Sequence, residues 1–96
     1  MKYIISQRAL DDINQIWYYT YKNWSLTQAD RYYKLLFDEI KFAAQNFSII
    51  RSAENIRSGY RMSQVKSHIL FYKQIDNNTI ELVRVLHQSM NIENKL

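Results

Sequence analysis

The side chains best suited to chemistry in this sequence are basic and aromatic groups that gather in its second half. They are Arg57, Arg61, Lys66, Tyr72, Lys73, Arg84 and His87. Arginines on strands can hold a phosphate through paired hydrogen bonds and stabilise charge that develops on it. A histidine at a strand end can act as a general acid, because its ordinary pKa is close to physiological pH. A more ordinary role for Arg84 is an ion pair with Glu81 or with a neighbouring strand.

Several other kinds of site are disfavoured by the composition. His68 and His87 are the only histidines and there is no cysteine, so we expect neither a metal centre nor a disulfide framework. Gly59 is the only glycine, which leaves no glycine-rich phosphate loop and little means of building an oxyanion hole. We therefore expect no metal, no cofactor and no conventional small-molecule active site.

Charge is distributed unevenly along the chain. The whole sequence has 13 basic and 9 acidic residues, a net charge of +4. Residues 51–73 contain five basic residues and one acidic residue, whereas residues 1–48 contain six and five. This asymmetry indicates a surface that meets nucleic acid or an acidic protein segment, although small basic domains without such partners are also common.

The elements that must position these groups follow from the hydrophobic pattern. Residues 2–6 are typical of a short strand, and Leu10, Ile13, Trp17, Tyr21 and Trp24 then recur at helical spacing, which predicts a buried stripe. Ser25 and Gln28 form a capping-box pattern that starts a second helix, which extends to about Asn46. So short a connection predicts an antiparallel helical hairpin.

Three β-like runs follow an irregular, basic loop over residues 48–58. They cover residues 59–66, 68–75 and 79–87, and Asp76-Asn77-Asn78 between the last two suits a hairpin turn with positive φ. We predict an α+β fold in a single domain, 1–96, with the order β-α-α-β-β-β. The sheet is expected to be antiparallel, with the two-helix hairpin packed on one face.

The last strand is apolar on both faces. Strict alternation places Ile80, Leu82 and Leu86 with Arg84, and Val83 and Val85 with Glu81 and His87. A strand of this kind is normally buried on both sides, yet only one helical layer is available. We expect the other face of the sheet to remain partly open as an interface.

The ordered set of motifs resembles the ParE toxins of the RelE/ParE superfamily over essentially the whole chain. The motifs are Ile-Trp-x-Tyr at 16–19, Ala-x-x-Tyr at 29–32, Ile-Arg-Ser-Gly-Tyr-Arg-Met at 56–62, His-Ile-Leu-Phe-Tyr at 68–72, and Arg-Val-Leu-His at 84–87 with Met90. The chain departs from the family pattern after the second helix, where Asn46 is followed by Phe47 instead of proline.

The resemblance implies a toxin of a type II toxin-antitoxin system. Such a toxin would inhibit DNA gyrase by trapping its cleaved-DNA complex, with indirect contact to the DNA, and would not itself be an enzyme. A ParD-like antitoxin would neutralise it in a hetero-oligomer, its acidic C-terminal segment folding on the toxin. No stretch approaches the ~20 apolar residues of a membrane span, and residues 1–8 lack a signal-peptide core, so we expect a cytoplasmic protein.

The alternative that the resemblance implies is a RelE-like, ribosome-dependent mRNA endoribonuclease. Arg61 and Arg84 could then bind phosphate and His87 could act as the acid, but no residue is evident as the base. For gyrase inhibition we expect the target to contact Arg61, Arg84, His87 and Met90. The antitoxin surface is expected at Arg57, Tyr60, Met62, Leu82, Val83 and Val85.

Overall fold

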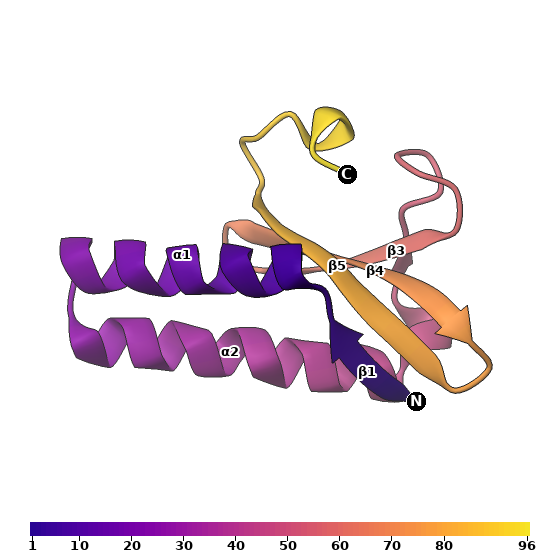
Figure 1. Ribbon diagram of the computed structural model, residues 1–96, viewed down its shortest axis with the longest axis horizontal. Helices are drawn as coiled ribbons and strands as arrows, with labels where there is room; N and C mark the ends of the chain where they lie inside the picture. The colour runs from indigo at the N-terminus through magenta and orange to yellow at the C-terminus, as the bar shows by residue number, and fades with distance from the viewer.

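The computed structural model describes residues 1–96 and packs a helical hairpin on one face of a five-stranded sheet (Figure 1). The elements in chain order are β1 (Lys2–Ile5), α1 (Gln7–Asn23), α2 (Leu26–Gln45), the 3₁₀ helix η1 (Phe47–Ile49), β2 (Arg51–Ser52), β3 (Tyr60–Val65), β4 (His68–Asp76), β5 (Thr79–His87) and the 3₁₀ helix η2 (Ile92–Asn94). The predicted α+β class is confirmed, and β2 is an additional strand of only two residues. Neither long helix is apolar enough along its length to cross a membrane.

Both helices begin at a serine whose side chain caps the first turn. The Ser6 hydroxyl accepts a hydrogen bond from the Ala9 N–H at 3.0 Å and donates to the Val83 carbonyl at 2.9 Å, which ties α1 to β5. The Ser25 hydroxyl accepts from the Gln28 N–H at 3.0 Å, as the capping-box pattern predicts. Only Trp24 and Ser25 separate the helices, so the hairpin is tight and antiparallel.

The sheet is mixed, not wholly antiparallel. Its strand order is β1-β5-β4-β3-β2, and β1 runs parallel to β5, with Lys2 opposite Thr79 and Ile5 opposite Leu82. The antiparallel prediction is therefore wrong at this edge. The hairpin and three strands lie between β1 and β5 in the chain, so no tight turn forces the two strands to be antiparallel.

The turns between β3 and β4 and between β4 and β5 contain no glycine, and their backbone conformations differ from the prediction. Lys66 has φ 51° in the turn between β3 and β4, and it is the one residue other than glycine with positive φ. The turn after Asp76 therefore does not use positive φ at its asparagines. The Asp76 carboxylate instead accepts the Asn78 N–H at 2.8 Å, which closes the turn through a side chain.

A β-bulge in β5 changes which side chains face the helices. Phe71 lies opposite Arg84 and Tyr72 lies opposite Leu82, so Val83 has no partner on β4. The bulge places Leu82 and Val85 together in the main core, whereas strict alternation assigned them to opposite faces. Leu86 turns to the other side of the sheet, which explains why β5 is apolar on both faces.

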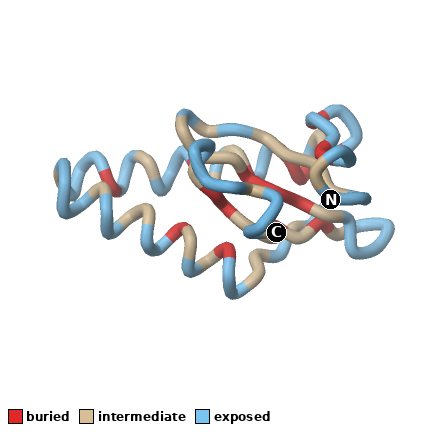
Figure 2. The backbone as a smooth tube through the Cα atoms, turned by 90° about the horizontal axis from the view of Figure 1, so that it is seen from above, coloured by how far each residue is buried: buried red, intermediate tan, exposed pale blue.

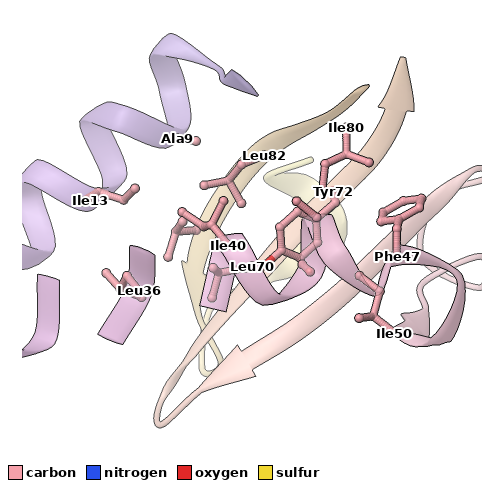
Figure 3. Packing of buried hydrophobic residues seen from close by; sticks show 13 residues of the cluster. Ala9, Ile13, Leu36, Ile40, Phe47, Ile50, Leu70, Tyr72, Ile80 and Leu82 are labelled. Atoms are coloured by element: carbon pink, nitrogen blue, oxygen red, sulfur yellow. The ribbon is translucent and has the colours of Figure 1, made fainter. Parts of the chain in front are cut away.

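The main core lies between the hairpin and the sheet (Figure 3). α1 contributes Ala9 and Ile13, and α2 contributes Leu36 and Ile40. The strands contribute Leu70, Tyr72, Ile80 and Leu82, all fully buried. Burial raises the pKa of the Tyr72 phenol, which remains neutral and is hydrogen-bonded to the Ser63 hydroxyl at 2.8 Å.

A smaller cluster covers part of the opposite face of the sheet. Ala53, Phe71 and Leu86 are buried there. Ile56 from the loop before β3, Tyr60 at the start of β3, and Ile92 and Leu96 from the C-terminal tail pack on them. The chain thus partly covers with its own loop and tail the face that we expected to be open.

Candidate functional site

The main concave feature of the surface is a cleft of about 920 Å³ between the hairpin and the end of the sheet. α1 forms one wall, and the turn after β3, the end of β5 and the tail form the other. Its lining residues are Asp12, Gln15, Ile16, Tyr19, Thr20, Trp24, Gln28, Tyr32, Lys66, Ser67, His68, Arg84, Val85, Leu86, His87, Ser89, Met90 and Lys95. No group of three or more His, Asp or Glu side chains is placed to hold a metal ion.

The cleft exists because the hairpin is longer than the sheet that it covers. Figure 1 shows the closed end of the hairpin projecting past the strands, and Figure 2 shows that this half is mostly exposed. Ile13 is fully buried, but Tyr21 is 44% exposed and Trp24 is 76% exposed. The prediction that Trp24 and Tyr21 belong to the core is therefore wrong, since the sheet ends before it can reach them.

Trp17 occupies an intermediate position on α1. Its ring stacks on Tyr21 with centroids 5.3 Å apart, and its indole N–H donates to the Asp30 carboxylate at 3.0 Å. This contact joins α1 to α2 within the projecting half of the hairpin. Trp17 and Tyr21 thus pack on each other within the hairpin, whereas Trp24 lines the cleft.

His68 and His87 form a cross-strand pair at the floor of the cleft. They lie opposite each other on β4 and β5, with ring centroids 5.3 Å apart and an edge-on arrangement. The Ser89 backbone N–H donates to Nδ1 of His87 at 3.1 Å, so that nitrogen carries no proton and a neutral ring has its N–H at Nε2. In this tautomer Nε2 is the hydrogen-bond donor of His87, and the residue lines the cleft.

His68 has the opposite tautomer. The Tyr32 hydroxyl lies 2.9 Å from the Val65 carbonyl and 2.7 Å from Nδ1 of His68. Because the phenol has a single proton and the carbonyl can only accept, both contacts are hydrogen bonds when His68 donates from Nδ1. Burial, and then the nearby His87, lower the pKa of His68. The neutral ring is left with an unprotonated Nε2.

Arg84 lies at the inner edge of the cleft and is fully engaged. Its Nε and Nη2 donate to the Asp12 carboxylate at 2.8 and 3.0 Å, and its Nη1 donates to the Lys95 carbonyl at 2.9 Å. The side chains of the two partners are only 12% and 13% exposed. The hydrogen bonds to Asp12 raise the pKa of Arg84, so its guanidinium remains charged.

Comparison with known proteins identifies the family. A model described as the ParE toxin of the type II toxin-antitoxin system parDE matches residues 3–92. The chain belongs to the ParE toxin family. Toxin ParE1 of Mycobacterium tuberculosis (strain H37Rv) is 40% identical over 95 residues, covering 99% of this chain and 97% of that protein. Toxin ParE1 of Caulobacter vibrioides is 38% identical over 89 residues, covering 93% and 91%.

The fold of this ParE-family chain also matches a solved structure. A chain from the chromosomal ParDE TA system of P. aeruginosa superposes with a TM-score of 0.79, covering 91% of this chain and 95% of that one. Its sequence identity is 12%, so the match supports the fold alone. What the two chains share is therefore the packing of the hairpin on the sheet.

Only some of the residues that we expected to contact the target line the cleft. His87 and Met90 both line the cleft, and Met90 is 46% exposed. Arg61 does not line the cleft: its guanidinium lies over the Phe47 ring at 5.3 Å and donates to the Ile50 carbonyl at 2.8 Å. Arg61 is thus separated from the cleft, whereas Arg84 lines it beside His87 but is held by Asp12 and the Lys95 carbonyl. Contact of the target with these arginines stays a prediction.

Some of the residues expected to bind the antitoxin are buried in the core, and the others are half-buried or exposed. Leu82 and Val85 are 0% and 3% exposed in the main core, so the expectation that they lie on the interface is wrong. Val83 is half-buried at the bulge. Tyr60 and Met62 are half-buried against the outer cluster, and Arg57 is exposed in the loop beside it.

Sequence reasoning missed Asp12, Tyr32 and Trp24 as neighbours in one cleft, and it considered His68 only as a metal ligand. Tyr32 reaches across from α2 to the turn after β3, and Asp12 reaches from α1 to β5. No local pattern indicates either contact, since the partners are 33 and 72 residues apart. Trp24 gave a signal, as an apolar residue in helical register, but periodicity alone assigned it to the core.

Proposed function

We propose that this chain is a toxin that inhibits DNA gyrase by trapping its cleaved-DNA complex, and that it acts in the cytoplasm without being an enzyme. The observation that carries the proposal is the match of nearly the whole chain to the ParE toxin family and to two proteins named Toxin ParE1. The cleft supports a binding role, because it combines exposed aromatic and apolar side chains with basic ones.

A supercoiling assay with purified gyrase and ATP tests this proposal directly. We expect the chain to inhibit supercoiling and to cause linear DNA to accumulate. Ribosome-programmed mRNA, assayed in parallel, should remain intact. Unchanged supercoiling at a large molar excess of folded chain would contradict the proposal.

Within the proposed target surface, His87 and Met90 are the accessible members. We expect His87→Gln and Met90→Ala to reduce gyrase inhibition about tenfold, as loss of central contacts in an interface does. Ile75→Ala is a suitable control, because Ile75 is 48% exposed but lies outside the cleft. If both cleft variants inhibit as strongly as the control, the target surface lies elsewhere.

One observation favours a second candidate, ribosome-dependent mRNA cleavage. The sequence lacked an evident base, and the structure places His68, whose neutral ring has an unprotonated Nε2, in the lining of the same cleft as His87. A base and an acid in one cleft, with Lys66 beside them, are the groups that phosphodiester cleavage requires. Cut mRNA with unaffected gyrase would establish this candidate in place of the first.

We also propose that a ParD-like antitoxin neutralises the chain in a hetero-oligomer. The solved structure with the same fold comes from a ParDE toxin-antitoxin system, and the net charge of +4 suits an acidic partner. Growth of cells that express the chain, with and without the co-expressed cognate antitoxin, tests the pairing. We expect growth arrest without the antitoxin and recovery with it.

A further inference from the structure

The outer face of α1 has a shallow hollow of its own, with a volume of about 510 Å³. Its lining residues form two adjacent rows at four-residue steps along the helix, namely Asn14, Gln15, Tyr18, Tyr19, Lys22 and Asn23. All six are exposed, whereas Ile13 is fully buried and Ile16 is half-buried on the other side of the helix. These six side chains are therefore not needed for the packing of the hairpin on the sheet.

The two tyrosines of the hollow are unusual residues for the solvent face of a helix. Tyr18 is 57% exposed and Tyr19 is 65% exposed, and neither ring stacks on another aromatic ring of the chain. Tyrosine is a weaker helix former than the lysine, glutamine or glutamate that suit an exposed helix position. Exposed aromatic surface that serves no contact within the fold is typical of an interaction site.

The polar groups around these rings indicate the chemistry of the occupant. The lining contains three amide side chains and one lysine, and it contains no carboxylate. The Lys22 ammonium lies 5.8 Å from the centre of the Tyr18 ring and has no carboxylate within 4 Å. Asp11, one turn before the hollow, accepts a hydrogen bond from the Gln7 amide at 2.9 Å. The hollow thus offers aromatic faces, amides and an unpaired positive charge to an anionic partner.

An unpaired nucleotide combines the groups that match these three. Its base has a flat face that stacks on an aromatic ring and an edge that forms hydrogen bonds with amides. Its phosphate lies one sugar away from the base and attracts a lysine, which suits a cation placed beside the ring of Tyr18. A volume of about 510 Å³ is within the range of small-ligand sites, ~300–1,000 Å³. A duplex matches less well, because its bases are stacked on one another.

We propose that the outer hollow of α1 binds unpaired nucleotides of DNA directly, with a base stacked on Tyr18 and a phosphate beside Lys22. The inference rests on the proposed function, since the DNA in question is the cleaved DNA held by gyrase. It gives the toxin a contact with the DNA itself, in place of the indirect contact expected from the sequence. An acidic protein segment fits less well, because its carboxylates would match Lys22 but not the flat faces of the two rings.

Fluorescence anisotropy with a labelled single-stranded oligonucleotide tests the site directly. Tyr18 and Lys22 are the residues to change, because they line the hollow but not the cleft, whereas Tyr19 and Gln15 line both. We expect Tyr18→Ala to raise the Kd of the oligonucleotide about tenfold, as loss of one stacked base does, and Tyr18→Phe to retain most of the affinity. Tyr18→Phe keeps the ring, so it separates stacking from any role of the hydroxyl.

The salt dependence of binding tests the phosphate contact. Lys22→Gln should weaken binding and reduce the slope of log K against log salt concentration by about 0.7, the value for one phosphate of a single strand. Tyr33→Ala and Lys41→Gln are the matched controls on α2, where both residues are exposed and lie outside the hollow. Each control should change the Kd less than about twofold, since distant exposed charges are screened.

The outcomes separate this inference from the proposed function. No binding of the oligonucleotide, or binding that Tyr18→Ala leaves unchanged, overturns the inference even when the wild-type chain inhibits gyrase. If Tyr18→Ala instead weakens binding to gyrase without DNA, or to the antitoxin, and leaves the oligonucleotide unaffected, the hollow is a protein contact and the inference is wrong. A chain that binds the oligonucleotide through Tyr18 but leaves supercoiling unchanged supports the site and contradicts the proposed function.

Discussion

Asp12 and Arg84 are 72 residues apart in the sequence, and their two-pronged ion pair joins the first helix to the last strand. The same carboxylate accepts the Val85 backbone N–H at 3.0 Å, directly after the β-bulge. Because the Arg84 guanidinium also donates to the Lys95 carbonyl, the tail is fixed to the same point. Three segments of the chain therefore depend on one pair of side chains, which gives Arg84 a structural role.

Removing Asp12 should destabilise the fold. Asp12→Ala leaves a nearly buried guanidinium and one backbone N–H without partners, and we expect the free energy of unfolding to fall by about 2–4 kcal/mol. Urea denaturation measures the loss, and Lys34→Ala is the control. Lys34 forms a 2.9 Å pair with Asp38 at the surface, and its loss should cost less than about 0.5 kcal/mol. Equal losses in the two variants would contradict the structural role.

The toxicity of Arg84 variants should be proportional to the fraction of the protein that is folded. We expect Arg84→Ala to lose gyrase inhibition in proportion to its loss of folded protein, since the guanidinium is held by Asp12 and Lys95 and is only 12% exposed on its side chain. Inhibition assayed below the melting temperature of the variant separates the two effects. A fully folded Arg84→Ala chain without activity would instead show that the target reads Arg84 directly.

His68 should make the stability depend on pH near neutrality. Its pKa is lower in the folded state than its ordinary value of 6.5, because burial and His87 disfavour the charged ring. The unfolded chain then binds more protons below pH 6.5, so stability is complete above that pH and falls as the pH is lowered toward the folded pKa. Urea denaturation between pH 5.5 and 8 measures this slope. An NMR titration of the His68 ring should give a midpoint below 6.5, and a midpoint above it would refute the prediction.

The Tyr32 hydroxyl should stabilise the joint between α2 and the turn after β3. Burial raises the pKa of Tyr32 to about 12, so the phenol remains protonated and can bridge Val65 and His68. Tyr32→Phe removes both hydrogen bonds at little cost in packing, and we expect a loss of about 1–2 kcal/mol. Tyr33→Phe is the matched control, since Tyr33 is 39% exposed and its hydroxyl has no hydrogen-bond partner within the chain. A loss in the control as large as in Tyr32→Phe would argue against the bridge.

Local features of the fold could be predicted because their causes are local. Ser25 and Gln28 are three residues apart, and the hydrogen bond between them starts α2 as the pattern indicates. The strands follow from runs of apolar residues bounded by short polar turns. The direction of β1 could not be predicted, since a strand contributes the same alternation to a parallel and to an antiparallel pair.

The site could be predicted only in part, because it depends on lengths and registers that are set far away in the chain. Periodicity indicates which face of α1 points inward, but not that the sheet ends at His68 and His87 and leaves Trp24 exposed. One unpaired residue, Val83, reverses the faces of the rest of β5. Leu82 and Val85 consequently share the core, and the expected antitoxin surface there is lost.

The C-terminal tail should contribute to stability by covering the outer face of the sheet. Ile92 and Leu96 pack on the cluster of Phe71 and Leu86, which would otherwise meet water. We expect the double variant Ile92→Ala and Leu96→Ala to lose about 1–2 kcal/mol, because both side chains are only partly buried. Ile75→Ala should cost less than about 0.5 kcal/mol in the same urea titration, since Ile75 is 48% exposed on β4. If the double variant is as stable as the wild type, the tail does not cover this face in solution, and the outer face is open to a partner after all.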